Sequence, residues 1–121
     1  MKLLLIEDDK FFRRFYVEKL REKGFEIAEA DDGNQGLEKV NSFKPDLIVL
    51  DIIMPVKDGF EVLKNLQADP LLKKIPVLVF STLGQESDIE KAKKMGATDY
   101  VNKSMFDFNE LVVKINALTK K

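Results

Sequence analysis

The side chain best placed to do chemistry in this sequence is an aspartate that follows an unbroken apolar run. The run Leu47–Leu50 contains no polar residue and stops at Asp51. A short apolar run of this kind predicts a strand buried on both faces, which is typical of parallel sheets covered by helices on each side. Asp51 is therefore expected at the carboxyl end of a central strand, where open α/β sheets bind their ligands.

Other predicted strands also end at polar side chains. In chain order these are Glu7-Asp8-Asp9, Ser81-Thr82 and Lys103. In a doubly wound sheet the ends of the first, third, fourth and fifth strands converge on one rim. We therefore expect these groups to lie near Asp51.

Such a rim would combine three kinds of chemistry. Clustered carboxylates form a hard-oxygen site that suits Mg²⁺, a hydroxyl and an ammonium suit phosphoryl oxygens, and a central carboxylate can accept a phosphoryl group as nucleophile. Each residue alone is commonly a helix cap, a turn residue or a solvated charge. Together they are informative, because like charges about 4 Å apart repel by about 4 kcal/mol at an effective dielectric near 20. A bound cation would offset that repulsion.

Strand and helix signals alternate five times along the chain, which predicts an α/β domain with a parallel sheet. The strands are expected at 3–6, 25–30, 47–51, 77–80 and about 100–103, and the helices at about 10–23, 34–42, 58–69, 86–95 and 109–118. The apolar runs are strongest in strands one, three and four, which favours a flavodoxin-like, doubly wound five-stranded sheet in the order 2-1-3-4-5 with five helices.

Local patterns refine three of the helices. Asp9 is expected to cap the first helix, whose predicted buried stripe is Phe12, Phe15, Tyr16 and Leu20. Gly36 lies inside the second helix, where glycine costs about 1 kcal/mol relative to alanine. The fourth helix offers a thin apolar stripe, namely Ile89, Ala92 and Met95.

Composition narrows the class of protein. The 121 residues are expected to form a single domain over 1–121. The chain has 20 basic and 21 acidic residues and neither cysteine nor histidine, which argues against thiol chemistry, histidine catalysis and thiolate or imidazole metal sites. The charge balance predicts no direct nucleic-acid or membrane binding. The short apolar start lacks the length of a signal peptide, so we expect a cytoplasmic protein.

At this point the sequence resembles the response-regulator receiver domains of two-component signalling over its whole length, most closely those of the single-domain, chemotaxis-regulator kind. The matching stretches are Leu4–Asp9, Leu50–Pro55 with Asp58-Gly59, Pro76–Ser81, Gly96–Val101 and Lys103.

The resemblance implies a role for each residue of the rim. Asp51 would be the phosphoacceptor. Mg²⁺ would be bound by Asp8, Asp51 and the backbone carbonyl of Ile53, and Glu7 would act through a water molecule. Ser81 and Lys103 would hold phosphoryl oxygens.

Three further positions follow from the same resemblance. Tyr100 would be the aromatic residue that turns inward on activation. Thr82 stands where a smaller residue is more usual and would narrow access to Asp51. Ser104 replaces a proline that usually follows the lysine in a cis bond. Because a cis bond before a residue other than proline costs about 3–4 kcal/mol, we expect a trans bond with Lys103 still near Asp51.

The function implied is a phosphorylation switch rather than a conventional enzyme, since the domain would catalyse only its own aspartyl phosphorylation and dephosphorylation. The phosphoryl group would come from a sensor histidine kinase or phosphotransfer protein, and the face formed by the fourth helix, fifth strand and fifth helix would signal to a downstream protein target or a missing output domain. The alternative is a receiver-like docking module that no longer cycles.

Two enzyme classes fit less well. A flavodoxin needs a loop rich in Ser, Thr and Gly after the first strand, and here that loop is acidic. A phosphatase of the haloacid dehalogenase kind needs a second aspartate two residues after the nucleophile, a position that Ile53 occupies.

Overall fold

The computed structural model describes residues 1–54, 57–82, 85–104 and 107–119. Among these residues the chain forms a five-stranded sheet, five α-helices and one short 3-10 turn. The strands are β1 (Lys2–Ile6), β2 (Glu26–Ala30), β3 (Leu47–Leu50), β4 (Val77–Ser81) and β5 (Asp99–Asn102). The helices are α1 (Lys10–Glu22), α2 (Gly33–Phe43), α3 (Gly59–Gln67), α4 (Glu86–Lys94) and α5 (Phe108–Thr119), and the 3-10 turn η1 covers Leu72–Lys74.

The sheet is parallel throughout and has the order β2-β1-β3-β4-β5, which confirms the predicted fold class. All four residues of β3 and all five residues of β4 are buried, as their continuous apolar runs predict. Pro55, the last residue of the matching stretch Leu50–Pro55, lies outside the described residues.

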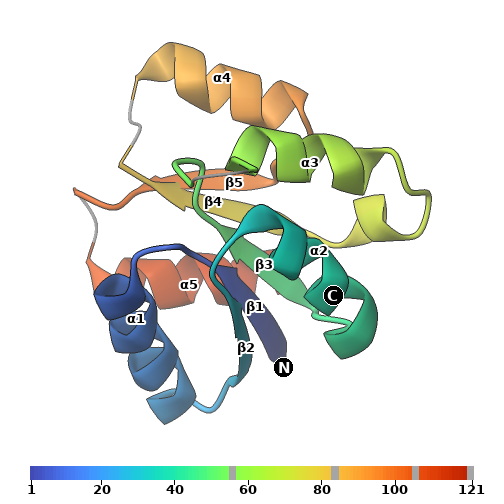
Figure 1. Ribbon diagram of the computed structural model, residues 1–121. Helices are drawn as coiled ribbons and strands as arrows, with labels where there is room; N and C mark the ends of the chain where they lie inside the picture. The colour runs from blue at the N-terminus through green and yellow to red at the C-terminus, as the bar shows by residue number, and fades with distance from the viewer. Residues whose placement is uncertain (55–56, 83–84, 105–106, 120–121) are drawn as a thin grey trace.

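Helices cover both faces of the sheet (Figure 1). Helices α1 and α5 lie on one face, and α2, α3 and α4 lie on the other. Alternate strand side chains divide accordingly into two buried clusters, one on each face. Leu4 and Val79 belong to the cluster beneath α2, α3 and α4, whereas Leu3 and Phe80 belong to the cluster beneath α1 and α5. This alternation follows from the two-residue period of a strand.

Three aspartates begin helices near the carboxyl ends of the strands. Asp9 accepts a hydrogen bond from the Phe12 N–H at 3.0 Å, and Asp32 accepts one from the Gln35 N–H at 2.8 Å. Asp58 accepts from the Glu61 N–H at 3.0 Å. Each side chain satisfies a backbone donor that the helix leaves without an intrahelical partner, so the predicted cap at Asp9 is confirmed.

The predicted buried stripe of α1 is wrong at one position. Phe15 is 45% exposed, whereas Val17, which the stripe omitted, is buried together with Tyr16 and Leu20. The helix presents Phe15 to the side of the α1–α5 layer, where its ring contacts Tyr16 and the ammonium of Lys19. In α4 only Ala92 is fully buried, and Ile89 and Met95 are partly buried, so the predicted thin anchor is confirmed.

Within the described part of the chain, every helix is too short or too polar to span a membrane.

The first testable prediction concerns Gly36, which is buried in α2. Helix propensity alone predicts that Gly36→Ala stabilises the protein by about 1 kcal/mol. The structure predicts the opposite, because an added Cβ would lie 2.5 Å from Ile6 Cδ1 and 3.0 Å from Ile6 Cγ1, and overpacking of this kind costs about 1–3 kcal/mol. We expect a net loss of stability in urea unfolding.

The matched control is the double variant Ile6→Val with Gly36→Ala, which removes the atom in closest contact. It should lose less stability than the sum of the two single variants. A Gly36→Ala protein that is more stable than wild type would show that α2 moves away from β1 at no cost.

Candidate functional site

Three backbone hydrogen bonds continue the sheet pairing to the residues of the rim. The Asp51 N–H donates to the Ile6 carbonyl at 3.0 Å, the Glu7 N–H to the Ala30 carbonyl at 3.0 Å, and the Lys103 N–H to the Ser81 carbonyl at 3.0 Å. Glu7, Asp51 and Lys103 are therefore each fixed to a neighbouring strand end. The sheet brings together residues that are far apart in the sequence.

Glu7, Asp8 and Asp51 form one acidic cluster. One carboxylate oxygen from each residue lies within 4.8 Å of the others. Glu7 is 1% exposed and Asp51 is 6% exposed, whereas Asp8 is exposed. The donor set consists of oxygen atoms only and opens to solvent at Asp8, which fits a small hard cation such as Mg²⁺ that retains water ligands.

Lys103 supplies the positive charge inside this cluster. Its ammonium contacts Glu7 Oε1 and lies 3.2 Å from Asp51 Oδ2, and its side chain is 8% exposed. The same ammonium lies 4.2 Å from the centre of the Phe12 ring and 5.7 Å from the centre of the Phe80 ring. An ammonium over an aromatic face gains about 0.5–2 kcal/mol, so two rings and two carboxylates hold Lys103 in place.

The backbone at Lys103 follows the expectation for a chain without the usual proline. No peptide bond between described residues is cis, so the bond from Lys103 to Ser104 is trans. The Ser104 N–H donates to Asn102 Oδ1 at 2.8 Å, which closes a tight turn directly after β5. Both parts of the prediction, a trans bond and a lysine near Asp51, are confirmed.

Burial raises the pKa of Glu7 to about 7, because the carboxylate loses its hydration. The hydrogen bond from Lys103 opposes this shift, and the neighbouring charge of Asp51 adds to it. In the metal-free protein, the Glu7 carboxyl group is therefore partly protonated near neutral pH.

Ser81 and Tyr100 lie together beneath the rim on the α4 side of the sheet. Ser81 is fully buried and Tyr100 is 8% exposed. Burial raises the pKa of Tyr100, and a side-chain hydrogen bond with Ser81 partly offsets that rise. The Tyr100 ring is therefore largely buried in this structure, and its inward turn on activation stays a prediction.

A pocket of about 270 Å³ lies over the acidic cluster. Its lining residues follow the ends of four strands or belong to α1: Glu7, Asp8, Asp9, Phe12, Asp51, Ile53, Thr82 and Lys103. Thr82 is exposed at its edge, at the position where the sequence expects it to narrow access. The Ile53 N–H donates to Asp51 Oδ1 at 3.3 Å, which orients the carboxylate.

Gly59 allows the start of α3 to pack against the backbone of Asp51, and the sequence analysis did not identify this role. A Cβ on Gly59 would lie 2.5 Å from the Asp51 carbonyl oxygen and 2.7 Å from Ile52 Cα. The Gly59 N–H also donates to the Ile52 carbonyl at 2.9 Å. The start of α3 therefore packs directly on the backbone of the central aspartate, which only glycine permits. The adjacent Asp58 cap was the available sequence signal.

Comparisons with known proteins agree with this arrangement. The sequence profile of the response regulator receiver domain matches residues 3–116. Among curated relatives, the chain is 34% identical over 120 residues to the DNA-binding dual master transcriptional regulator RpaA of Synechocystis, covering 99% of this chain and 49% of that protein. It is 32% identical over 120 residues to the phosphate regulon transcriptional regulatory protein PhoB of Escherichia coli, covering 99% of this chain and 52% of PhoB. The chain thus spans about half the length of these relatives.

Solved structures give the same answer for the fold. The receiver domain of the Francisella response regulator 1452 matches with a TM-score of 0.90 and 34% identity, covering 98% of this chain and 96% of that one. The Vibrio cholerae chemotaxis protein CheY4 matches with a TM-score of 0.89 and 28% identity, covering 97% of each chain. On this evidence the chain belongs to the response regulator receiver domain family of two-component systems.

Proposed function

We propose that this receiver, spanning residues 1–121, is a phosphorylation switch in which Asp51 accepts a phosphoryl group from a phosphohistidine. The observation that supports this most directly is the position of Lys103, whose buried ammonium lies 3.2 Å from Asp51 Oδ2. A nucleophilic carboxylate and a fixed cation at one pocket are the two protein groups that phosphoryl transfer to aspartate requires.

In the transfer step, an Asp51 oxygen forms a bond to phosphorus while the bond from phosphorus to the donor's imidazole nitrogen breaks. The electron pair of that bond leaves with the imidazole. Lys103 would exchange part of its contact with Glu7 and Asp51 for a phosphoryl oxygen, and the Ser81 hydroxyl would bind a second oxygen. Both contacts stabilise negative charge that spreads over the equatorial oxygens.

The acidic cluster would hold Mg²⁺ through Asp8, Asp51 and the Ile53 carbonyl, with Glu7 acting through water. The metal, when bound, supplies charge neutralisation for the approaching phosphoryl group. The all-oxygen cluster within 4.8 Å supports this assignment.

The partners proposed are a sensor histidine kinase or a phosphotransfer protein upstream and a protein target or an attached output domain downstream. Curated relatives are about twice as long as this chain, and the names of RpaA and of PhoB describe transcriptional regulators. The proposed setting is the cytoplasm. The domain would act on itself only, which distinguishes it from an enzyme that turns over a separate substrate.

The proposed output face consists of α4, β5 and α5. Phosphorylation would draw the Ser81 hydroxyl away from Tyr100 toward the phosphoryl group, which changes the packing beneath α4. Only Ala92 of α4 is fully buried, fewer residues than in any of the other four helices, so α4 would be the element most easily reset.

The first test of this function is chemical labelling. Asp51→Ala should abolish phosphoryl addition from acetyl phosphate, detected by intact-protein mass spectrometry, because the nucleophile is absent. Asp46→Ala is the matched control: Asp46 lies at the opposite end of β3, where it accepts a hydrogen bond from the Lys2 N–H, and labelling should persist. Labelling of Asp51→Ala would identify another nucleophile, and an unlabelled wild type would favour the docking module that no longer cycles.

The second test combines metal removal with pH. Because the folded pKa of Glu7, about 7, exceeds its ordinary value of 4.5, the folded state holds this proton more tightly than the unfolded state. The resulting contribution to stability is complete below about pH 4.5 and is lost as pH rises through 7. In chelator, wild type should therefore lose stability across this window relative to Glu7→Gln.

At neutral pH, Mg²⁺ should restore the stability that the metal-free protein loses as pH rises. Metal binding adds about 2.7 kcal/mol to the free energy of unfolding at a hundredfold excess over the dissociation constant. Thermal melts across a magnesium titration measure the effect. Asp8→Asn should weaken it by removing a ligand. A melting temperature that does not respond to Mg²⁺ would remove the metal from the proposal.

The third test locates the output face. Amide hydrogen exchange with and without beryllofluoride and Mg²⁺, which mimic a phosphorylated aspartate, should differ most in the segment from 83 to 100, including α4; within it, residues 83–84 lie outside the described residues. Differences that are largest in α1 and α2 would place the output on another face.

A further inference from the structure

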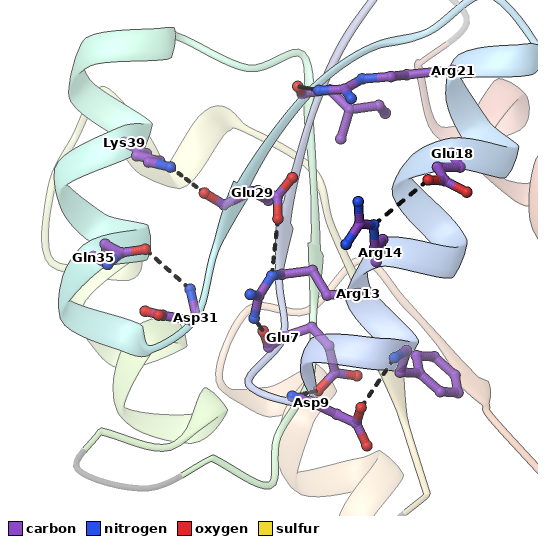
Figure 2. Close-up of polar contacts among 12 residues, drawn as sticks. Glu7, Asp9, Arg13, Arg14, Glu18, Arg21, Glu29, Asp31, Gln35 and Lys39 are labelled. Carbon is purple, nitrogen blue, oxygen red and sulfur yellow. Dashed lines mark hydrogen bonds and ion pairs between the residues drawn. The ribbon is translucent and has the colours of Figure 1, made fainter.

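Arg13 extends from α1 toward Glu7 of the acidic cluster and toward Glu29 of β2 (Figure 2). Its Nη1 donates to the backbone carbonyl of Glu7 at 2.8 Å, and its Nε donates to Glu29 Oε1 at 3.0 Å. The side chain is 14% exposed although it carries a charge. Neither the proposed phosphoryl transfer nor the proposed metal ligands use this residue.

The carbonyl that Arg13 binds belongs to the peptide joining Glu7 to Asp8. The other polar groups of Glu7 are also held: its N–H donates to Ala30, and its carboxylate accepts from the Asp9 N–H at 3.2 Å and contacts Lys103. The Arg13 bond therefore holds the carbonyl of this peptide, while the other bonds hold the backbone and side chain of Glu7 beside it. Loss of the Arg13 bond would free this carbonyl and allow the backbone that carries Asp8 to shift relative to Glu7 and Asp51.

The guanidinium of Arg13 is itself held in position. Glu29 is on the edge strand β2 and binds Arg13 through its carboxylate, while Lys39 of α2 contacts the Glu29 backbone carbonyl. Figure 2 shows this connection from Lys39 through Glu29 to Arg13 and Glu7. A planar guanidinium presents its donors in a fixed fork, so it loses less conformational freedom for each hydrogen bond than an ammonium on a flexible stem does.

We propose that Arg13 is a positioning residue that sets the separation of the Glu7 and Asp8 carboxylates and thereby the affinity of the cluster for Mg²⁺. The inference rests on the proposed function, because it assigns the cluster to a metal. The effect is geometric rather than electrostatic: the bond is made to a main-chain oxygen, and Glu29 already balances the charge of Arg13 at 3.0 Å.

The experiment compares Arg13→Met with Arg14→Met. Both variants remove one positive charge from adjacent positions of α1, but Arg14 is 75% exposed and pairs with the exposed Glu18 at 3.7 Å. Magnesium affinity is measured by isothermal titration calorimetry at a temperature where circular dichroism shows each variant folded. We expect Arg13→Met to weaken binding by about tenfold or more, the usual effect of losing a group that orients a metal ligand. Arg14→Met should stay near the wild-type value.

Two additional variants separate geometry from charge. Arg13→Lys keeps the charge and should still bind Mg²⁺ more weakly than wild type, because one ammonium cannot bridge Glu29 and the Glu7 carbonyl in the same way. Glu29→Ala should give an intermediate loss, since Arg13 keeps its bond to Glu7 but loses its support. If Arg13→Met does not fold, these two variants provide the test.

A second readout requires no metal. The carbonyl ¹³C chemical shift of Glu7 in metal-free protein should change in Arg13→Met and stay at its wild-type value in Arg14→Met, because only the former loses the hydrogen bond.

The inference is overturned if Arg13→Met lowers the melting temperature while its folded form binds Mg²⁺ as tightly as Arg14→Met, since Arg13 would then only support the fold. Full recovery of affinity in Arg13→Lys would overturn the geometric account. A wild type that binds no Mg²⁺ contradicts the proposed metal and this inference together, whereas normal wild-type binding with equal variants contradicts this inference alone.

Discussion

The repulsion among Glu7, Asp8 and Asp51 is the constraint on which the rest of the site depends. Two of these carboxylates are buried, and burial strengthens their mutual repulsion. Lys103 offsets part of it through direct contact with Glu7 and Asp51. The pKa of Glu7 is nevertheless raised, mainly because burial removes the hydration of the carboxylate, and the neighbouring charge of Asp51 adds to the shift. The metal-free pocket therefore favours any added positive charge, which is the physical basis of the proposed magnesium dependence.

The parallel sheet makes this crowding possible by fixing the main chain beneath each charge. Glu7, Asp51 and Lys103 are each bonded to the adjacent strand end, so they cannot separate without breaking sheet hydrogen bonds. Further contacts act on the side chains: the Phe12 ring lies beneath the Lys103 ammonium, and Arg13 binds the Glu7 carbonyl. The rigid scaffold therefore keeps like charges close together, and a bound cation can relieve their repulsion.

The elements of this scaffold are buried to different extents, which suits the proposed phosphorylation switch. Strands β3 and β4 are buried throughout, whereas α4 has a single fully buried residue, Ala92. Ser81 connects the two regions, because it ends β4 near Asp51 and shares a hydrogen bond with Tyr100 beneath α4. In the proposed function, a change in charge at Asp51 would alter the packing of α4, which has one fully buried residue, while the sheet remains fixed.

The sequence by itself determined the sheet order and the residues that meet at the rim, because continuous apolar runs reveal central strands and their last residues mark the carboxyl ends. The trans bond after Lys103 also followed from local chemistry. Only the tertiary structure decided contacts between distant elements. Helix propensity marks Gly36 as destabilising, but the close approach of Ile6 leaves no room for a Cβ there. The apolar pattern places Phe15 in the core, but its side chain is 45% exposed. From the sequence alone, Arg13 would be taken for a surface charge. In the structure it binds the backbone carbonyl of Glu7, just after β1, and the carboxylate of Glu29 in β2. Helical periodicity locates a face but cannot say which neighbouring atoms lie opposite it.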